Sequence, residues 1–574
     1  MTSPLHVRWL GKVPYREAFA VQRSLFEHSH EQHLLLLEHP HVFTYGPSAD
    51  LNKNLKCVPS EVGADFVKVN RGGDITYHGP GQLVGYPILN LQPKHGGNAG
   101  PADTNDYIFR VEQLLIDSLN ELGLNDVGRL ADYPGVWVGV AANEPRKICA
   151  IGVRLSRGRT MHGFALNVET DLAYMREHIV PCGIAEYPVT SLREEGIETS
   201  LQEVSEVVAR HVARVFADGN IARQDVAWYH RPEDLSAFSR GEGAGEPVRL
   251  ISRLAQAGVG DGLKIEERKP EWLRPKVRLT EEVMETKKIV RDLGLVTVCE
   301  EAGCPNLSEC WRDGTATFMV LGERCTRACG FCLVDTRKPD LPDVDEPLRV
   351  ALAVAQMRLQ HAVLTMVARD DLPDGGFGHV AECINQIRRH NPGTTIETLV
   401  SDAKGDTASL QLLFDARPDV FNHNIETVAR LQRTVRPSAG YARSLSVLAR
   451  ARRAGLVTKS GFMLGLGEQN HGVGEQSHEV QSLLADLACV GVSIVTIGQY
   501  LRPTNDHLPV VRWASPDEFA HYKTYGESLG ITHVESSPLT RSSYHAKQAA
   551  ADAGVVAVAV PVAVPVAMPV LVRR

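Results

Sequence analysis

Apolar residues in the first part of the chain fall into short runs that end at glycine or proline. Such runs are typical of short strands. One longer stretch, residues 106–124, instead repeats its apolar residues at helical spacing. The strand-like runs are residues 33–46, 83–91, 135–140 and 147–155. This pattern predicts a mixed α/β domain.

In the second part of the chain, buried-type runs alternate with helical stretches such as residues 440–455. Strands that alternate with helices form parallel βα arrays. The runs are residues 362–367, 419–424, 459–466 and 493–500. We therefore expect a second α/β domain built as a full or partial (β/α) barrel.

A segment rich in glycine, proline and charge separates the two patterns and reads as a linker. A chain of 574 residues is also too long for one core, and its length favours about two to four domains. The expected division is a first domain at 1–230, a linker at 231–262, a second domain at 263–549 and a tail at 550–574.

The tail contains only Val, Ala, Pro, Met and Leu from Val555 to Val572. Its length alone would allow a membrane span. However, Pro561, Pro565 and Pro569 each remove a backbone donor, which a helix in lipid could not replace. We expect an extended, low-complexity tail and no membrane partner.

The formal net charge is −8 and the isoelectric point is near 6.3, which argues against a nucleic-acid partner. One local basic cluster is either a docking patch for an acidic protein or a solvated face. Its members are Arg146, Lys147, Arg154, Arg157 and Arg159.

Eleven cysteines and the polar start of the chain suggest a reducing, cytoplasmic location. His6, Arg8 and Lys12 interrupt any apolar run of the kind found in a signal peptide. Cysteines in such a compartment bind metals or do chemistry more often than they form disulfides.

Six cysteines form two uneven triplets, C-x4-C-x5-C and C-x3-C-x2-C. They are Cys299, Cys304 and Cys310, followed by Cys325, Cys329 and Cys332. Three thiolates fill three corners of a 4Fe-4S cluster and leave one iron open to another ligand. Zinc is the weaker alternative, because structural zinc usually takes four protein ligands.

The first domain has a glycine-rich loop at Arg71–Gln82, which would let a ligand approach the backbone. Farther along, Cys182 lies between Pro181 and Gly183. A thiolate there could attack a thioester, and Lys147 could favour the thiolate and move its proton. The plainer alternatives are an inert buried thiol and a surface charge.

The motifs RGGDITYHGPGQLVGYPILNL, KICAIGVRL, MHGFALNV and PCGIAEYPVTSL, in this order, resemble lipoyl(octanoyl) transferases over residues 5–225. The resemblance implies a fold similar to that of lipoate and biotin protein ligases. It also implies that Cys182 and Lys147 are catalytic, with octanoyl held as a thioester on Cys182. Cys149 replaces a small residue of the family, and we expect it to pack in the core.

The substrate-binding residues implied by this resemblance come from three motifs. They are Arg71, Gly72, Gly73, Tyr77, His78, Gly79, Ala150, Ile151, Gly152, His162, Gly163, Phe164 and Ala165.

The run CEEAGCPNLSECWRDGTATFMVLGERCTRACGFC resembles lipoyl synthases, which are radical S-adenosylmethionine enzymes, over residues 265–549. The resemblance implies two 4Fe-4S clusters. The first triplet, with Ser543 of RSSYHA as fourth ligand, would hold an auxiliary cluster. The second would hold the cluster that binds S-adenosyl-L-methionine. The implied segments are 263–315 for the auxiliary cluster, 316–535 for a partial barrel and 536–549 for RSSYHA.

Several positions depart from the lipoyl synthase pattern. Met366 and Ala368 replace a serine and an acid, and Asp402 survives while its neighbours differ. Asp374 begins a DGG sequence that either meets the methionyl amino group or is simply a turn. Asn424 and Glu426 either bind S-adenosylmethionine or peptide, or cap and pack.

The two resemblances together imply consecutive reactions in protein lipoylation. The first half would move octanoyl from octanoyl-acyl carrier protein to a lipoyl-domain lysine. The second would insert sulfur at carbons six and eight by radical chemistry. One alternative is an active transferase fused to a non-catalytic iron–sulfur module. An ATP-using lipoate ligase is disfavoured, because adenylate chemistry needs no thiol nucleophile.

The implied partners follow from these reactions. They are octanoyl-acyl carrier protein, the lipoyl domains of 2-oxoacid dehydrogenase E2 subunits and glycine cleavage H protein, and an electron donor such as ferredoxin or flavodoxin.

Overall fold

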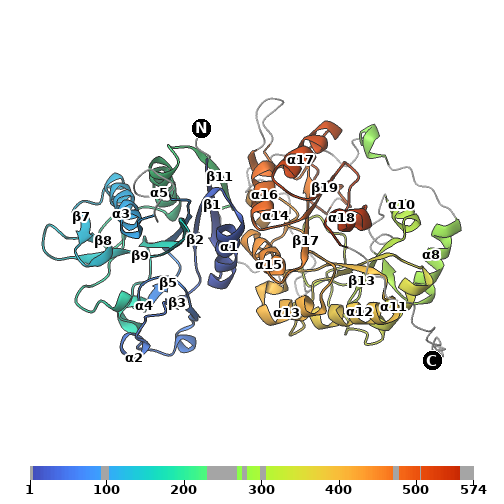
Figure 1. Ribbon diagram of the computed structural model, residues 1–574, viewed down its shortest axis with the longest axis horizontal. Coiled ribbons are helices and arrows are strands. Elements are labelled where there is room, and N and C mark those ends of the chain that lie inside the picture. Colours follow the sequence, from blue (N-terminus) through green and yellow to red (C-terminus); the bar gives the residue numbers. More distant parts are fainter. Residues whose placement is uncertain are drawn as a thin grey trace.

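The computed structural model describes residues 4–91, 102–228, 268–274, 281–297, 306–469, 478–504 and 506–555. Two α/β halves lie side by side (Figure 1). The expected linker and the tail beyond residue 555 lie outside the described residues. Helix α18 (Ala546–Asp552) crosses the domain boundary expected at residue 549. No described helix has the length and apolar character that crossing a membrane requires.

A mixed sheet forms the body of the first half, with strand order β11-β1-β2-β6-β10-β9-β8-β7. A smaller sheet, β4-β3-β5, lies beside it. The strands are β1 (Leu5–Lys12), β2 (Gln32–Glu38), β3 (Val42–Tyr45), β4 (Asp65–Lys68), β5 (Thr76–His78), β6 (Gln82–Ile88), β7 (Val127–Leu130), β8 (Tyr133–Val138), β9 (Arg146–Ser156), β10 (Arg159–Asn167) and β11 (Ile221–Asp225).

Helices cover both faces of the larger sheet. Leu34 and Leu36 of β2 belong to the core that includes α3 and α5, whereas Leu35 and Leu37 belong to the core that includes α1. This alternation explains the unbroken apolar run of β2, since both of its faces are buried. The helices are α1 (Tyr15–His28), α2 (Leu51–Asn54), α3 (Thr104–Glu121), α4 (Ala173–His178) and α5 (Leu201–Phe216), with 3₁₀ turns η1 (Pro59–Val62) and η2 (Pro181–Gly183).

The second half has the parallel βα array that the sequence predicts. Strands β13 to β19 pair in parallel in chain order, and β12 pairs antiparallel with β13. The strands are β12 (Val296–Thr297), β13 (Thr315–Val320), β14 (His361–Met366), β15 (Thr395–Leu399), β16 (Val420–Asn422), β17 (Val457–Leu464), β18 (Ile494–Gln499) and β19 (His533–Ser536). The expected fold class, a mixed α/β domain followed by a partial barrel, is confirmed.

Helices alternate with these strands, as expected for right-handed βα connections. They are α8 (Glu281–Asp292), α10 (Leu307–Arg312), α11 (Glu346–Gln356), α12 (Phe377–His390), α13 (Thr407–Ala416), α14 (Gln432–Val435), α15 (Tyr441–Arg453), α16 (His478–Cys489), α17 (Pro516–Ser528) and α18, with 3₁₀ turns η3 (Glu271–Leu273), η4 (Ala403–Gly405) and η5 (Ala429–Leu431).

One hydrophobic cluster spans both halves. Helix α1 lies against α15 (Figure 1), and Ala18, Val21 and Leu25 belong to the same buried cluster as Leu445 and Leu448. The Arg8 Nε atom lies 3.0 Å from the Asp486 carboxylate across this contact, and both side chains are buried. A large apolar interface of this kind holds two domains in one orientation.

Candidate active sites

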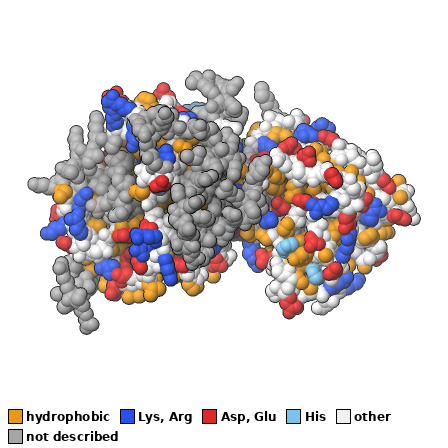
Figure 2. Space-filling model, turned by 180° about the vertical axis from the view of Figure 1, so that it is seen from behind, with side chains coloured by type: hydrophobic (Ala, Val, Ile, Leu, Met, Phe, Trp, Pro, Cys, Tyr) orange, Lys and Arg blue, Asp and Glu red, His pale blue; other side chains and the backbone are white. Residues whose placement is uncertain are grey.

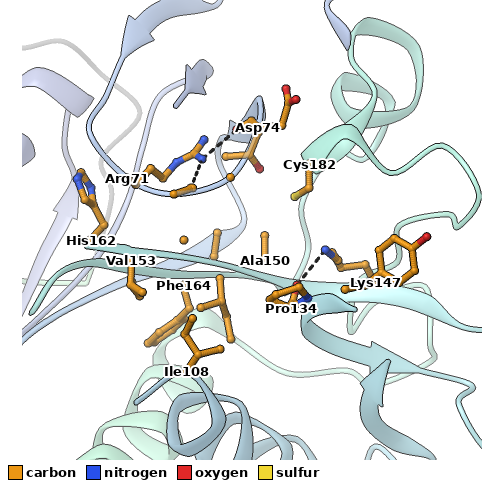
Figure 3. A pocket seen from close by; sticks show the side chains of 18 of the residues that line it. Arg71, Asp74, Ile108, Pro134, Lys147, Ala150, Val153, His162, Phe164 and Cys182 are labelled. Carbon is orange, nitrogen blue, oxygen red and sulfur yellow. Dashed lines mark hydrogen bonds between the residues drawn. The ribbon is translucent and has the colours of Figure 1, made fainter. Parts of the chain in front are cut away.

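A cavity of about 530 Å³ in the first half collects residues from all four motifs of that half. It includes Cys182, Lys147 and every predicted substrate-binding residue except Tyr77 and Gly79. In Figure 3, Cys182 and Lys147 lie together at one end of the cavity and His162 lies at the other. Strands β9 and β10 supply much of the lining, because small or apolar side chains there leave space above the sheet.

Tyr77 and Gly79 are not among the residues that line this cavity. The Tyr77 ring is fully buried, and its hydroxyl lies 2.7 Å from His41 Nδ1. A Cβ atom at Gly79 would collide with that hydroxyl, so Gly79 makes room for the ring. These two residues shape the glycine-rich loop without lining the cavity.

Cys182 has an unusual backbone conformation within the 3₁₀ turn η2. Its φ of 58° and ψ of 17° lie in the left-handed region, which residues other than glycine seldom adopt. Its amide donates to the Ile75 carbonyl at 2.8 Å, and its side chain is partly exposed to the cavity. Strained backbone of this type is concentrated at functional sites.

The Lys147 ammonium is held by a carbonyl and an aromatic ring. Nζ donates to the Pro134 carbonyl at 3.2 Å (Figure 3). It also lies 4.7 Å from the centre of the Trp137 ring. The side chain is only 5% exposed. Both partners are uncharged, so they fix the position of the ammonium without forming an ion pair with it. The ammonium can therefore interact with a thiol or an amine in the cavity.

Arg71 brings a second positive charge to the same cavity. Its guanidinium donates to the carbonyls of Asp74 at 2.9 Å and Thr44 at 2.8 Å. Burial lowers the pKa of Arg71, and a negative charge on Cys182 acts in the opposite direction. Because arginine stays protonated in proteins, a fixed positive charge lines the same cavity as Cys182.

Two histidines of the lining are neutral. Burial and nearby positive charges hold the pKa of His78 well below its usual range and lower that of His162 to about 3. The Nδ1 atom of His78 lies 2.9 Å from Gln82 Oε1. Uncharged imidazoles suit a slot for an apolar chain better than a site for an anion.

Some lining residues were missed by the sequence analysis because they lie on helices and loops far from the motifs. Tyr15 starts helix α1, and Ile108 lies on α3, where its apolar character looks like ordinary helix packing. Cys149, in contrast, is fully buried in the core, and its expected packing role is confirmed.

The second cysteine triplet lies on the loop after β13, among loops that follow other strands of the barrel. The amide of Thr326 and its hydroxyl both donate to the Ala368 carbonyl, each at 2.9 Å. Gly330 donates to Val435 at 2.8 Å, and His507 Nε2 lies 2.9 Å from the Cys332 carbonyl. Active sites of βα barrels are built at this carboxyl end of the strands.

The loop of the second triplet suits an iron–sulfur cluster in donor type and packing. Burial raises the pKa of Cys329 to about 11 and that of Cys332 to about 12, so both are neutral thiols until a metal replaces the proton. A Cβ at Gly330 would lie 2.7 Å from Leu508, so the loop needs glycine there. Within the described ranges, no three His, Cys, Asp or Glu side chains surround a single-ion position.

The first triplet is only partly described. Cys310 is buried on α10, while Cys299 and Cys304 lie outside the described residues. Near Cys310, Tyr544 donates to Glu309 at 3.2 Å, which brings the RSSYHA segment next to α10. Within that segment, the Ser542 hydroxyl accepts a hydrogen bond from Asn424 Nδ2 at 2.7 Å.

Of the positions compared with the family pattern, Ala368 departs from it, while Asp402 and Asp374 keep it. Ala368 supports the cysteine loop through its carbonyl, which a change of side chain does not remove. Asp402 is fully buried and accepts from Arg327 at 2.7 Å. Asp374 accepts from the amides of Gly376 and Gly378 at 2.9 Å each, so the DGG sequence forms the turn that starts α12.

The basic cluster, for which the sequence allows either a docking patch or a solvated face, is not gathered on one surface. Lys147 is in the cavity, and Arg159 is 7% exposed with Nη1 donating to Asn90. Arg146 pairs with Glu195 at 2.9 Å. On the face in Figure 2, acidic and basic side chains are interspersed over the described residues.

Comparisons with known proteins assign the two halves to two families. Residues 14–213 match the lipoyl protein ligase A/B catalytic domain, and residues 319–475 match the radical SAM superfamily. A lipoyl synthase from Rubrobacter xylanophilus is 53% identical over 287 residues, which are 50% of this chain and 87% of that protein. A lipoyl synthase from Mycobacterium leprae is 50% identical over 299 residues, 52% of this chain and 91% of that protein.

Solved structures similar to parts of the chain include lipoate-protein ligase A bound with ATP and methylornithine synthase. The ligase is 17% identical with a TM-score of 0.32, and the match covers 40% of this chain and 90% of the ligase chain. The methylornithine synthase is 12% identical with a TM-score of 0.30, and the match covers 45% of this chain and 83% of the synthase chain. On its sequence identity over nearly the whole length of these relatives, the chain belongs to the lipoyl synthase family, and it carries a lipoyl protein ligase A/B catalytic domain in front of its radical SAM region.

Proposed function

We propose that this chain is a bifunctional protein-lipoylation enzyme. Residues 1–230 transfer octanoyl from octanoyl-acyl carrier protein to a lipoyl-domain lysine, and residues 263–549 insert two sulfur atoms into the attached chain. The observation that supports transfer most strongly is the placement of a strained, partly exposed Cys182 in one cavity with Lys147. Its volume of about 530 Å³ lies within the range of small-molecule sites.

The cavity favours a thioester mechanism over adenylate formation. Ile108, Val153 and Phe164 line it, which suits an acyl chain (Figure 3). A ligase that activates its substrate with ATP needs no nucleophilic thiol, whereas thioester transfer requires one. Arg71 and Lys147 line the same cavity as Cys182, and nearby cations are the setting in which a cysteine attacks as its thiolate.

Transfer proceeds in two steps. The Cys182 sulfur bonds to the octanoyl carbonyl carbon, and the carrier's thiolate leaves and takes up the proton that Cys182 released. The lipoyl-domain amine then attacks the new thioester, an amide bond forms and the Cys182 thiolate leaves. The Lys147 ammonium is placed to relay a proton: it gives a proton to the leaving Cys182 sulfur and takes up the proton of the amine, because the Pro134 carbonyl and the Trp137 ring hold its Nζ in the cavity.

In the second half, the chain's own residues position two 4Fe-4S clusters and S-adenosyl-L-methionine. When bound, these groups supply a radical able to take hydrogen from an unactivated carbon, and sulfur to replace it. Cys325, Cys329 and Cys332 would hold one cluster. Cys299, Cys304, Cys310 and Ser543 would hold the other. The surviving support of the cysteine loop by Ala368 and Asp402 favours turnover over a non-catalytic module.

The partners of this proposal follow from its two reactions, and we place them in the cytoplasm. They are octanoyl-acyl carrier protein, lipoyl domains of 2-oxoacid dehydrogenase E2 subunits or glycine cleavage H protein, and ferredoxin or flavodoxin as electron donor.

The test of the transferase assignment is the choice of acyl donor. The chain is incubated with an unmodified lipoyl domain and either octanoyl-acyl carrier protein alone, or free octanoate with ATP. We expect octanoylation from the carrier without ATP, read by intact mass. Octanoylation that requires free acid and ATP would instead identify a ligase.

Ser543→Ala should disturb the auxiliary cluster alone. The neighbouring hydroxyl of Ser542 is already bonded to Asn424, so Ser542→Ala is the matched control. We expect Ser543→Ala to change the Mössbauer signal of the cluster held by the first triplet, because a site-specific iron ligand is lost. An unchanged signal, or the same change in Ser542→Ala, would remove Ser543 from the ligand set.

A further inference from the structure

A row of buried and partly buried charged side chains crosses the contact between the halves. It runs from the cysteine loop of the second half to helix α1 of the first. Its members, called here the interface charge row, are Arg327, Asp402, Arg443 and Glu17. Asp402 is fully buried, while Arg327 and Glu17 are 6% exposed each. Such groups are costly to bury unless each has a partner.

The synthase end of the row holds the loop that carries the second cysteine triplet. Arg327 lies between Cys325 and Cys329, and its amide donates to the Cys325 sulfur at 3.4 Å. Its guanidinium binds Asp370 at 2.8 Å and Asp402 at 2.7 Å. Two carboxylates from different strand loops therefore fix the orientation of Arg327.

Asp402 has two oxygens with different surroundings. Oδ1 accepts from Arg327 and from the Lys404 amide at 3.0 Å. Oδ2 is buried without a hydrogen-bond partner, and Arg443 Nη1 lies 3.9 Å from it. Arg443 therefore lies close enough to compete with Arg327 for Asp402.

The transferase half holds Arg443 away from that competition. Glu17 of α1 accepts from Arg443 Nε at 2.8 Å. The loop after Asp402 closes onto the same carboxylate, because a Cβ at Gly405 would collide with Glu17 Oε1. Glu17 thus contacts both Arg443 and the Asp402 loop.

We propose that Glu17 is a positioning residue for the synthase half: through Arg443 it keeps Asp402 available to Arg327 and so fixes the cysteine loop that binds S-adenosylmethionine with its cluster. The inference rests on the proposed synthase function. In this arrangement, the second active site depends on Glu17, a side chain of the first domain that does not line the transferase cavity.

Helix α1 offers a matched control. Glu27 also pairs across the interface, with Arg453 at 3.4 Å, but this pair is half exposed. Exposed pairs contribute little. Glu17→Gln and Glu27→Gln therefore remove the same charge from the same helix, and only the first change reaches the interface charge row.

The experiment uses the full chain, reconstituted with iron and sulfide without oxygen. S-adenosylmethionine affinity is measured from the change it causes in the EPR signal of the reduced cluster. For Glu17→Gln we expect about tenfold weaker binding, which is ~1.4 kcal/mol, with octanoyl transfer unchanged. For Glu27→Gln we expect both quantities to match the unsubstituted chain.

Equal affinities in the two variants would overturn the inference, as would a parallel loss of octanoyl transfer in Glu17→Gln, which would indicate general unfolding. A second test uses the Arg443→Gln background, where Glu17→Gln should add no further loss because Glu17 acts through Arg443. Additive losses would contradict that route. Failure of the unsubstituted chain to bind S-adenosylmethionine would instead contradict the proposed synthase function.

Discussion

Cys182→Ala is expected to lower octanoyl transfer by a factor on the order of 10³ or more, because the proposed carrier of the acyl group is lost. The lipoyl domain should stay unmodified in the presence of octanoyl-acyl carrier protein, as read by intact mass. Iron content and the EPR signal of the second half should not change, because Cys182 lies in a separate cavity.

The control is Cys57→Ala. Cys57 is a partly exposed thiol of the same half, outside the cavity lining. The Cys57→Ala variant should transfer octanoyl at the rate of the unsubstituted chain. After proteolysis, its Cys182 peptide should still carry the octanoyl group. Transfer that persists in Cys182→Ala, or an adduct found on another cysteine, would refute the nucleophile assignment.

Cys329→Ala is expected to abolish sulfur insertion and leave octanoyl transfer intact. Cys329 is the middle ligand of the proposed cluster that binds S-adenosylmethionine, and the two remaining thiolates cannot hold that cluster. The lipoyl domain should therefore accumulate in its octanoylated form. Iron should fall from about eight to about four atoms per chain, since each cluster holds four.

Cys383→Ala provides the comparison in this half. Cys383 is fully buried on α12 and packs among apolar side chains. This variant should keep both the iron and the lipoylated product, apart from a modest loss of stability. Full iron content in Cys329→Ala, or sulfur insertion at an undiminished rate, would show that the second triplet does not hold the reactive cluster.

The sequence predicted the architecture well because apolar spacing directly reflects burial. Alternating runs and helical stretches predicted the parallel array from β13 to β19. The four transferase motifs also meet in one cavity, as the resemblance implied. Both results depend on local patterns that a single sequence contains.

Other features depend on contacts between distant positions, which local patterns do not contain. Tyr77 belongs to a site motif but does not line the cavity, and Tyr15 enters the lining from a helix with no motif. The apparent basic patch is not one surface, because Lys147 lines the cavity, Arg159 is buried and Arg146 pairs with Glu195. Glu17 and Arg443 are 426 positions apart, so no local pattern could reveal their pairing.

The most direct test of the whole account is the mass of one lipoyl domain followed through a single anaerobic reaction. The full chain is reconstituted with iron and sulfide, then supplied with octanoyl-acyl carrier protein, S-adenosylmethionine and a reductant, without ATP. The account predicts an octanoylated domain first and a lipoylated domain later. A domain that stays unmodified, or that stops at octanoyl while the chain carries both clusters, would contradict it.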